Sequence, residues 1–159
     1  EIKKVVSPDS RVQMKMVHVD GESLATGIAT AVVDASVEEC TAYHVVDLDS
    51  KNTKKNMKKY GLTKIAVKQI NAHSIYYSST RELGYFLKPR EGRSQLTWMK
   101  EEDGRVIIDV TDKKDVLKEY PVQDGNVLVS IHTVWVFEPL DPIGEIPQTA
   151  VFLITRVDT

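Results

Sequence analysis

Residues 126–138 read NVLVSIHTVWVFE, and this stretch decides the fold class of the chain. It is rich in β-branched and aromatic residues, which favour an extended backbone. Alternate side chains of a strand point to opposite faces of its sheet, so the stretch predicts a long strand with two largely apolar faces. One face carries Val127, Val129, Ile131, Thr133, Trp135 and Phe137, and the other carries Leu128, Ser130, His132, Val134 and Val136.

Similar runs lie on both sides of this strand and are separated by turn signals. The residues Glu102-Asp103-Gly104 predict a hairpin turn between two of the runs. Three prolines between Pro139 and Pro147 predict a loop after the long strand. The other strands of this part of the chain are predicted at Lys64–Ala72, His73–Thr80, Arg93–Lys100, Arg105–Thr111 and Thr149–Val157.

The first third of the chain predicts a hairpin followed by two short helices. Asp20-Gly21 is a turn signal that joins predicted strands at Arg11–Val19 and Leu24–Val33. Ser36 and Glu39 have the spacing of a capping box, in which each side chain binds the backbone N–H of the other residue. It predicts a helix over residues 37–46.

Asp49 or Ser50 is expected to cap a second helix that runs to Tyr60 and ends at Gly61. One or two further helical turns are predicted within Asp112–Tyr120.

The order of these elements predicts an α+β fold. Consecutive strands joined by short turns favour an antiparallel sheet. A sheet of so many long strands twists and curls, and its concave side must be covered by helix or filled by a ligand. We therefore expect one domain over residues 11–159, built on a curved antiparallel sheet with two short helices after the second strand. Residues 1–10 are expected to be a lead-in segment.

The composition excludes several classes of function. The 159 residues suit a single domain, and a net charge of −2 gives no general attraction to nucleic acid. Cys40 has no disulfide partner and no zinc-type cluster around it, so we expect a reducing, cytoplasmic environment; the alternative is a secreted protein without disulfides. The sequence contains no EF-hand loop, P-loop or dinucleotide fingerprint, so we expect no metal and no cofactor. No apolar run approaches transmembrane length. Because the first residue is not Met, the chain is expected to be part of a larger protein.

Three stretches carry a resemblance to a known family. The first is TAVVDASVEE at residues 30–39, where a strand leads into a helix. The second begins with Pro89-Arg90-Glu91 and continues through Trp98 to the turn EDGRVI at residues 102–107. The third is Thr155-Arg156-Val157-Asp158 in the last strand. In order and spacing they resemble the START-like lipid-transfer domains of the Bet v 1-like helix-grip superfamily.

The resemblance implies a curved sheet that grips a long C-terminal helix and encloses a cavity for a lipid, a sterol or another apolar molecule. This chain stops at Thr159, where that helix should begin, so we expect the gripping helix to be missing or truncated. An uncovered apolar sheet face would favour self-association.

The resemblance and the strand pattern together indicate residues that would contact an apolar ligand. His132 would hydrogen-bond a ligand in the concavity or be satisfied by a neighbouring strand. Arg90 would anchor the polar end of a ligand or pair at the sheet edge. The predicted ligand-binding residues are Arg90, Trp98, Ile108, His132, Trp135 and Phe152.

Two groups of helix residues have other expected roles. Cys40 and His44 are expected to pack in the core. The lysines of the second helix either form a solvated face or contact anionic lipid headgroups at a membrane surface. They are Lys51, Lys54, Lys55, Lys58 and Lys59.

The leading hypothesis is a non-catalytic, intracellular module that holds an apolar ligand and contacts membranes peripherally, within a larger signalling protein. One alternative is a polyketide cyclase or aromatase-like enzyme of the same superfamily, for which His132, Arg90 and Asp109 are the candidate catalytic residues. Another alternative is a regulatory scaffold domain without a ligand.

Overall fold

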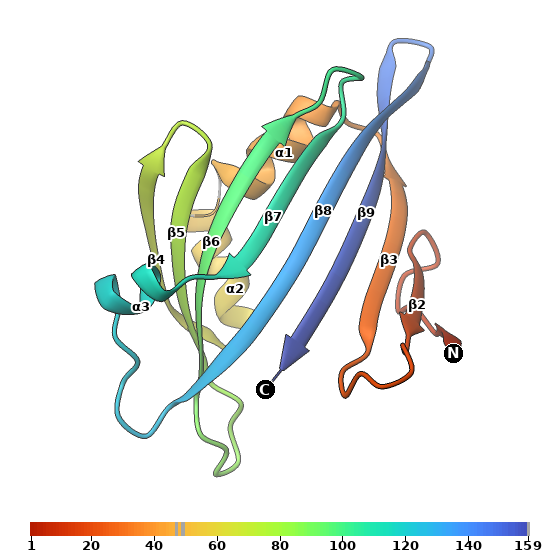
Figure 1. Ribbon diagram of the computed structural model, residues 1–159. Helices are drawn as coiled ribbons and strands as arrows, with labels where there is room; N and C mark the ends of the chain where they lie inside the picture. The colour runs from red at the N-terminus through yellow and green to blue at the C-terminus, as the bar shows by residue number, and fades with distance from the viewer. Residues whose placement is uncertain (47, 49, 159) are drawn as a thin grey trace.

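The computed structural model describes residues 1–46, 48 and 50–158, except for the side chain of residue 52. Within these residues, nine strands form one sheet (Figure 1). The strand order is β1-β2-β3-β9-β8-β7-β6-β5-β4, and neighbours in this order are antiparallel. The strands are β1 (Ile2–Val5), β2 (Gln13–Val17), β3 (Thr26–Val33), β4 (Leu62–Asn71), β5 (Ser74–Arg81), β6 (Arg90–Lys100), β7 (Val106–Asp112), β8 (Val127–Ile143) and β9 (Ile146–Asp158).

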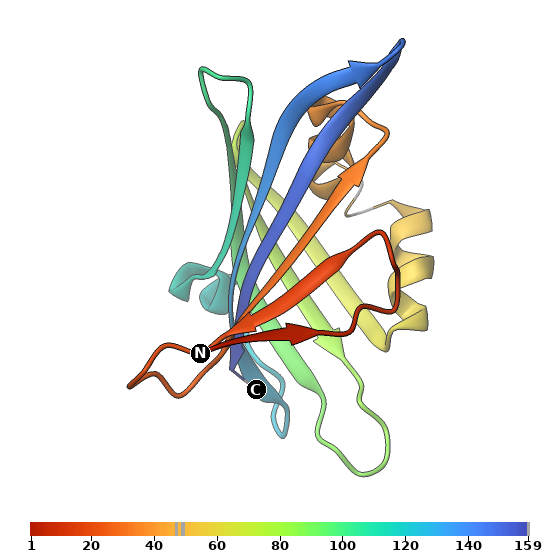
Figure 2. The same cartoon turned by 90° about the vertical axis from the view of Figure 1, so that its right-hand side faces the viewer.

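The sheet curves around two short helices. Helices α1 (Val37–Val45) and α2 (Lys51–Lys59) lie on its concave side, and the third helix, α3 (Lys114–Glu119), lies on the other side (Figures 1 and 2). The predicted α+β class, with a curved antiparallel sheet and two helices after the first predicted hairpin, is confirmed. The described residues contain no long helix after β9.

Two segments differ from the predictions. Residues 2–5 of the predicted lead-in form the edge strand β1, which pairs with β2 from Ile2 opposite Val17 to Val5 opposite Met14. The prediction of a loop over residues 139–147 is wrong, because β8 and β9 continue through it as a projecting hairpin (Figure 1).

The position of the hairpin explains why prolines are tolerated there. Strand β7 pairs with β8 only as far as Phe137, and β3 pairs with β9 only as far as Thr149. Beyond these residues β8 and β9 have no second neighbour. The missing N–H of a proline can then face solvent without breaking a ladder.

The helix boundaries follow the predicted signals. The Ser36 side chain accepts a hydrogen bond from the Glu39 N–H at 3.1 Å, and the Glu39 carboxylate accepts one from the Ser36 N–H at 2.7 Å. Ser50 caps α2 by accepting from the Thr53 N–H at 3.1 Å, while the alternative cap, Asp49, lies outside the described residues.

Gly61 ends α2 with a left-handed φ of 79°. Its carbonyl accepts a hydrogen bond from the Glu82 N–H at 2.8 Å, and a Cβ added at Gly61 would lie 2.6 Å from the Glu82 carbonyl oxygen. Only glycine fits both the backbone angle and this close approach. The end of α2 is therefore fixed against the end of β5.

The convex side carries a buried ion pair beneath α3 and the loop that follows it. Glu91 and Arg93 on β6 are 0% and 4% exposed and form a salt bridge. Arg93 also donates to the Tyr120 carbonyl at 2.5 Å, and Glu91 accepts from the Gln123 N–H at 3.2 Å and from the side chain of Asn126. Burial opposes ionisation of Glu91, but these hydrogen bonds and the charge of Arg93 hold its pKa below the usual range.

We predict that Arg93→Met destabilises the protein by about 3–5 kcal/mol, because Glu91 would be left as a buried charge without its partner. The free energy of unfolding in urea measures this. Arg11→Met, which breaks the exposed pair between Arg11 and Asp9, is the control and should have little effect. Equal effects of the two substitutions would contradict the buried network.

Candidate functional site

A pocket of about 370 Å³ lies between the helices α1 and α2 and the concave side of the sheet. It is at the lower end of the volume range of small-molecule sites. Among the described residues that line it, none is an Asp, Glu, Lys or Arg. They are Tyr43, His44, Leu48, Thr53, Asn56, Met57, Tyr60, Tyr77, Leu96, Ile108, Val110 and Trp135.

Neighbouring strands build the floor of the pocket through their register. Leu96 on β6 lies opposite Val110 on β7, and Ile108 lies opposite Trp135 on β8. Directly paired residues of antiparallel strands point to the same face. The four side chains thus form one continuous apolar surface, which joins the core that includes Ile75 and Phe137.

Helix α2 forms one wall of the pocket. Thr53, Asn56, Met57 and Tyr60 recur at helical spacing, so one face of the helix is directed toward the sheet. The Tyr77 hydroxyl on β5 donates to the Met57 sulfur at 3.8 Å. Burial raises the pKa of Tyr77, so its hydroxyl stays neutral around neutral pH.

His44 on α1 brings a polar ring into this apolar surface. The centre of its ring lies 4.3 Å from that of Trp135, 5.3 Å from that of Phe137 and 5.5 Å from that of Tyr43. Its Nδ1 lies 3.2 Å from the Cys40 carbonyl oxygen. Burial lowers the pKa of His44, and the contact with Cys40 opposes this only in part. The imidazole is therefore neutral at neutral pH.

Of the predicted ligand-binding residues, Ile108 and Trp135 line the pocket. Trp98 is on the same face of the sheet but packs against the ring of His73, 4.4 Å away between centres. The register places Arg90 on the concave side, opposite Arg81, where it donates to the Lys88 carbonyl at 2.7 Å. Its Nε is buried and has no hydrogen-bond partner within the described part of the chain.

Neither His132 nor Phe152 faces the concavity, so their predicted contact with a ligand there is wrong. The other alternative for His132, a partner on a neighbouring strand, is confirmed. The His132 side chain is 62% exposed and lies 3.1 Å from Asp109, another candidate, on the convex side. Phe152 pairs with Val136, which shares the His132 face of β8. Residues 132 and 135 are an odd number of positions apart, so they cannot both face the pocket. Because both faces of β8 carry apolar side chains, the sequence did not indicate which one was concave.

The sequence interpretation missed the residues that the helices contribute. His44 packs against the core, as expected, but it also lines the pocket, which the sequence interpretation did not predict. The helical spacing of Thr53, Met57 and Tyr60 could have indicated a face of α2 directed toward the sheet. Because five lysines lie in the same helix, it was interpreted only as a basic surface. Cys40 packs against the core, and burial raises the pKa of its thiol.

No family model matches the sequence, and no curated protein matches it either. Solved structures do match. The lipid transfer and protein localization domain of human StarD13 (DLC2) superposes with a TM-score of 0.76 at 15% identity, over 99% of this chain and 75% of that one. The fold is START-like.

Two further START-related structures agree. Human StAR-related lipid transfer protein 5 gives a TM-score of 0.73 at 15% identity, over 99% of this chain and 72% of the other. A STAR-related lipid transfer protein (fragment 25-204) from Xanthomonas axonopodis gives 0.70 at 12% identity, over 96% and 80%. At such low identity the START-like likeness concerns the fold alone.

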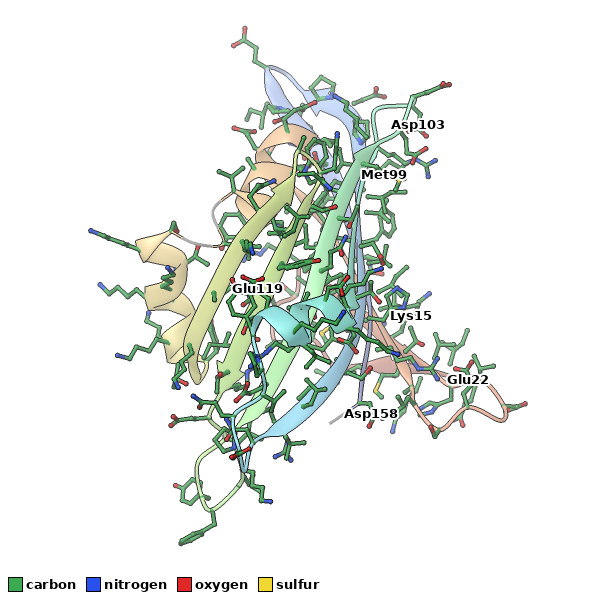
Figure 3. The ribbon with its side chains drawn as sticks, turned by 60° about the vertical axis from the view of Figure 1, so that its left-hand side comes forward. Lys15, Glu22, Met99, Asp103, Glu119 and Asp158 are labelled. Carbon is green, nitrogen blue, oxygen red and sulfur yellow. The ribbon has the colours of Figure 1, made fainter. Side chains whose placement is uncertain are left out.

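Two features bear on what else this START-like chain could contact. No helix in the described ranges is long and apolar enough to cross a bilayer. The five lysines of α2 are exposed, and long side chains project from this helix away from the sheet (Figure 3).

The buried His44 predicts a dependence of stability on pH. The unfolded chain takes up a proton near the ordinary histidine pKa of 6.5, whereas the folded protein resists protonation at His44 until lower pH. The contribution of the neutral ring is therefore complete above that pKa and is lost as the pH falls below it. As the pH falls from about 7 to 5, the melting temperature of His44→Phe should therefore decrease less than that of the native protein. Parallel melting profiles would contradict a buried, neutral His44.

Proposed function

We propose that this protein is a non-catalytic module that binds a lipid or another apolar molecule in the pocket between α1, α2 and the concave side of the sheet. The observation that carries the proposal is the apolar pocket itself, which the packing of the helices leaves open. Burial of a ligand there would release water from apolar surface, and this is the dominant driving force for such binding. The names of the matching structures from human StarD13 and StAR-related lipid transfer protein 5 refer to lipid transfer, which supports the same class of ligand.

Substitution of Val110 by Trp should abolish ligand binding, because the larger side chain would fill the pocket from β7. Organic extraction of the purified native protein, followed by mass spectrometry, should yield a bound apolar molecule that is absent from Val110→Trp.

Met99→Trp is the matched control. Met99 lies on the side of the sheet away from α1 and α2 (Figure 3) and is 49% exposed, so it has room for the larger ring. This variant should retain the molecule. A native protein that yields no apolar molecule, and binds none when it is added, would contradict the proposed function and favour a scaffold role.

We also propose that the module contacts anionic membranes through the loop between β5 and β6. Tyr85 and Phe86 at its tip are 95% and 106% exposed, and both adopt left-handed backbone angles, with φ of 46° and 64°. Such angles cost free energy for residues other than glycine. Tyrosine favours the membrane interface, and phenylalanine is typical of the apolar face that enters it.

Lysine side chains lie in the same region as the exposed rings of Tyr85 and Phe86. Lys88 lies in the same loop, and Gly61 joins the base of the loop to the end of α2, beside Lys58 and Lys59. Clusters of basic residues next to apolar groups are typical of contacts with anionic headgroups. The arrangement supports a membrane contact near one end of the pocket wall.

The double variant Tyr85→Ser/Phe86→Ser should lose most of its binding to vesicles that contain phosphatidylserine, because both apolar rings are removed. Co-sedimentation with the vesicles measures this. Ile143→Ser is the control, since Ile143 is 68% exposed at the opposite end of the sheet, in the β8–β9 hairpin (Figure 1). Equal loss in both proteins, or no binding by the native protein, would contradict the membrane contact.

The enzyme alternative has less support. Asp109 and His132 are paired, but they are exposed on the convex side, away from the pocket. Arg90 lies apart from both. Self-association through an uncovered sheet face stays a prediction.

A further inference from the structure

His44 has one ring nitrogen that is occupied by the protein and one that is not. Nδ1 lies 3.2 Å from the Cys40 carbonyl oxygen. A carbonyl oxygen only accepts, so this hydrogen bond requires the proton to be on Nδ1. The lone pair is then on Nε2, on the far side of the ring from the helix backbone. No group in the described ranges hydrogen-bonds this nitrogen.

The rings around His44 hold this acceptor in an apolar environment. Trp135 and Phe137 pack against the imidazole from the sheet, and Tyr43 packs against it from α1. A ligand that displaced water from Nε2 without supplying a donor would therefore lose free energy. The Tyr77 hydroxyl does not meet this need, since it donates to the Met57 sulfur.

The lack of charged side chains in the described lining disfavours two classes of ligand head group. A carboxylate or phosphate would lose its hydration with no Lys or Arg among the described lining residues to replace it, and it would meet the Nε2 lone pair. An ammonium group would find no Asp or Glu there. The lining therefore favours a head group that is uncharged and that donates a hydrogen bond.

We propose that the pocket selects an uncharged apolar molecule with a hydroxyl group, and that this hydroxyl donates its hydrogen bond to Nε2 of His44. The inference rests on the proposed function and narrows it from apolar ligands in general to alcohols. The hydrocarbon part of the ligand would lie on Leu96, Ile108 and Val110.

Three probes of similar length separate this inference from general apolar binding. Decanol carries the hydroxyl, its isomer methyl nonyl ether has the same atoms but no donor, and decanoate carries a charge. Titration calorimetry of the native protein should show decanol binding roughly tenfold more tightly than the ether, which is the effect of one satisfied hydrogen bond. Decanoate should bind more weakly than both.

Two variants test the role of His44. His44→Phe keeps an aromatic ring of similar size but removes the acceptor, so decanol and the ether should bind it equally. His44→Gln keeps an acceptor and should retain part of the preference for decanol. Circular dichroism of both variants verifies that they are folded.

The outcomes are distinguishable. Equal binding of decanol and ether to the native protein, or decanoate binding as tightly as decanol, would overturn the inference while leaving the proposed function intact. An unchanged preference for decanol in folded His44→Phe would also overturn it. If none of the three probes bound the native protein while folded, the proposed function would fail together with the inference.

Discussion

The contact between α1 and the concave side of β8 determines where the pocket lies. His44 packs its ring against Trp135 and Phe137, and Val37, in the first turn of the helix, is buried in the same core. The chain just before the helix is fixed as well, because the Thr149 hydroxyl donates to the Ala35 carbonyl at 2.7 Å. With α1 packed on β8 and α2 packed on β4, the space between them stays open above β6 and β7.

Local chemistry made much of the fold predictable from the sequence. The capping box at Ser36, the stop at Gly61 and the alternation along β8 each depend on a few neighbouring residues, and the structure contains all three. The hairpin through Pro139 was not predictable in the same way. It depends on where β3 and β7 end, which is a property of the assembled sheet.

The candidate site was predictable only in part, for a related reason. Alternation separates the two faces of a strand but does not say which face is concave when both are apolar, so Trp135 and His132 were both selected. The concave side is determined by the side on which α1 and α2 pack. The helix residues of the pocket, such as His44 and Met57, become recognisable only once that packing is known. Identity of 12–15% with proteins of the same fold shows that this fold does not depend on one particular sequence.

At Gly61 the end of α2 lies directly against the start of the β5–β6 loop, although the two are separate in the sequence. The Glu82 N–H donates to the Gly61 carbonyl, and a Cβ at Gly61 would collide with the Glu82 carbonyl, so the end of the pocket wall and the root of the β5–β6 loop are held against each other. Changes in the length or sequence of the loop tip, which projects into solvent, should therefore cost little folding free energy, whatever they do to a membrane contact. The corner at Gly61 allows no comparable variation, and any side chain placed there would displace the loop root and the end of α2 together.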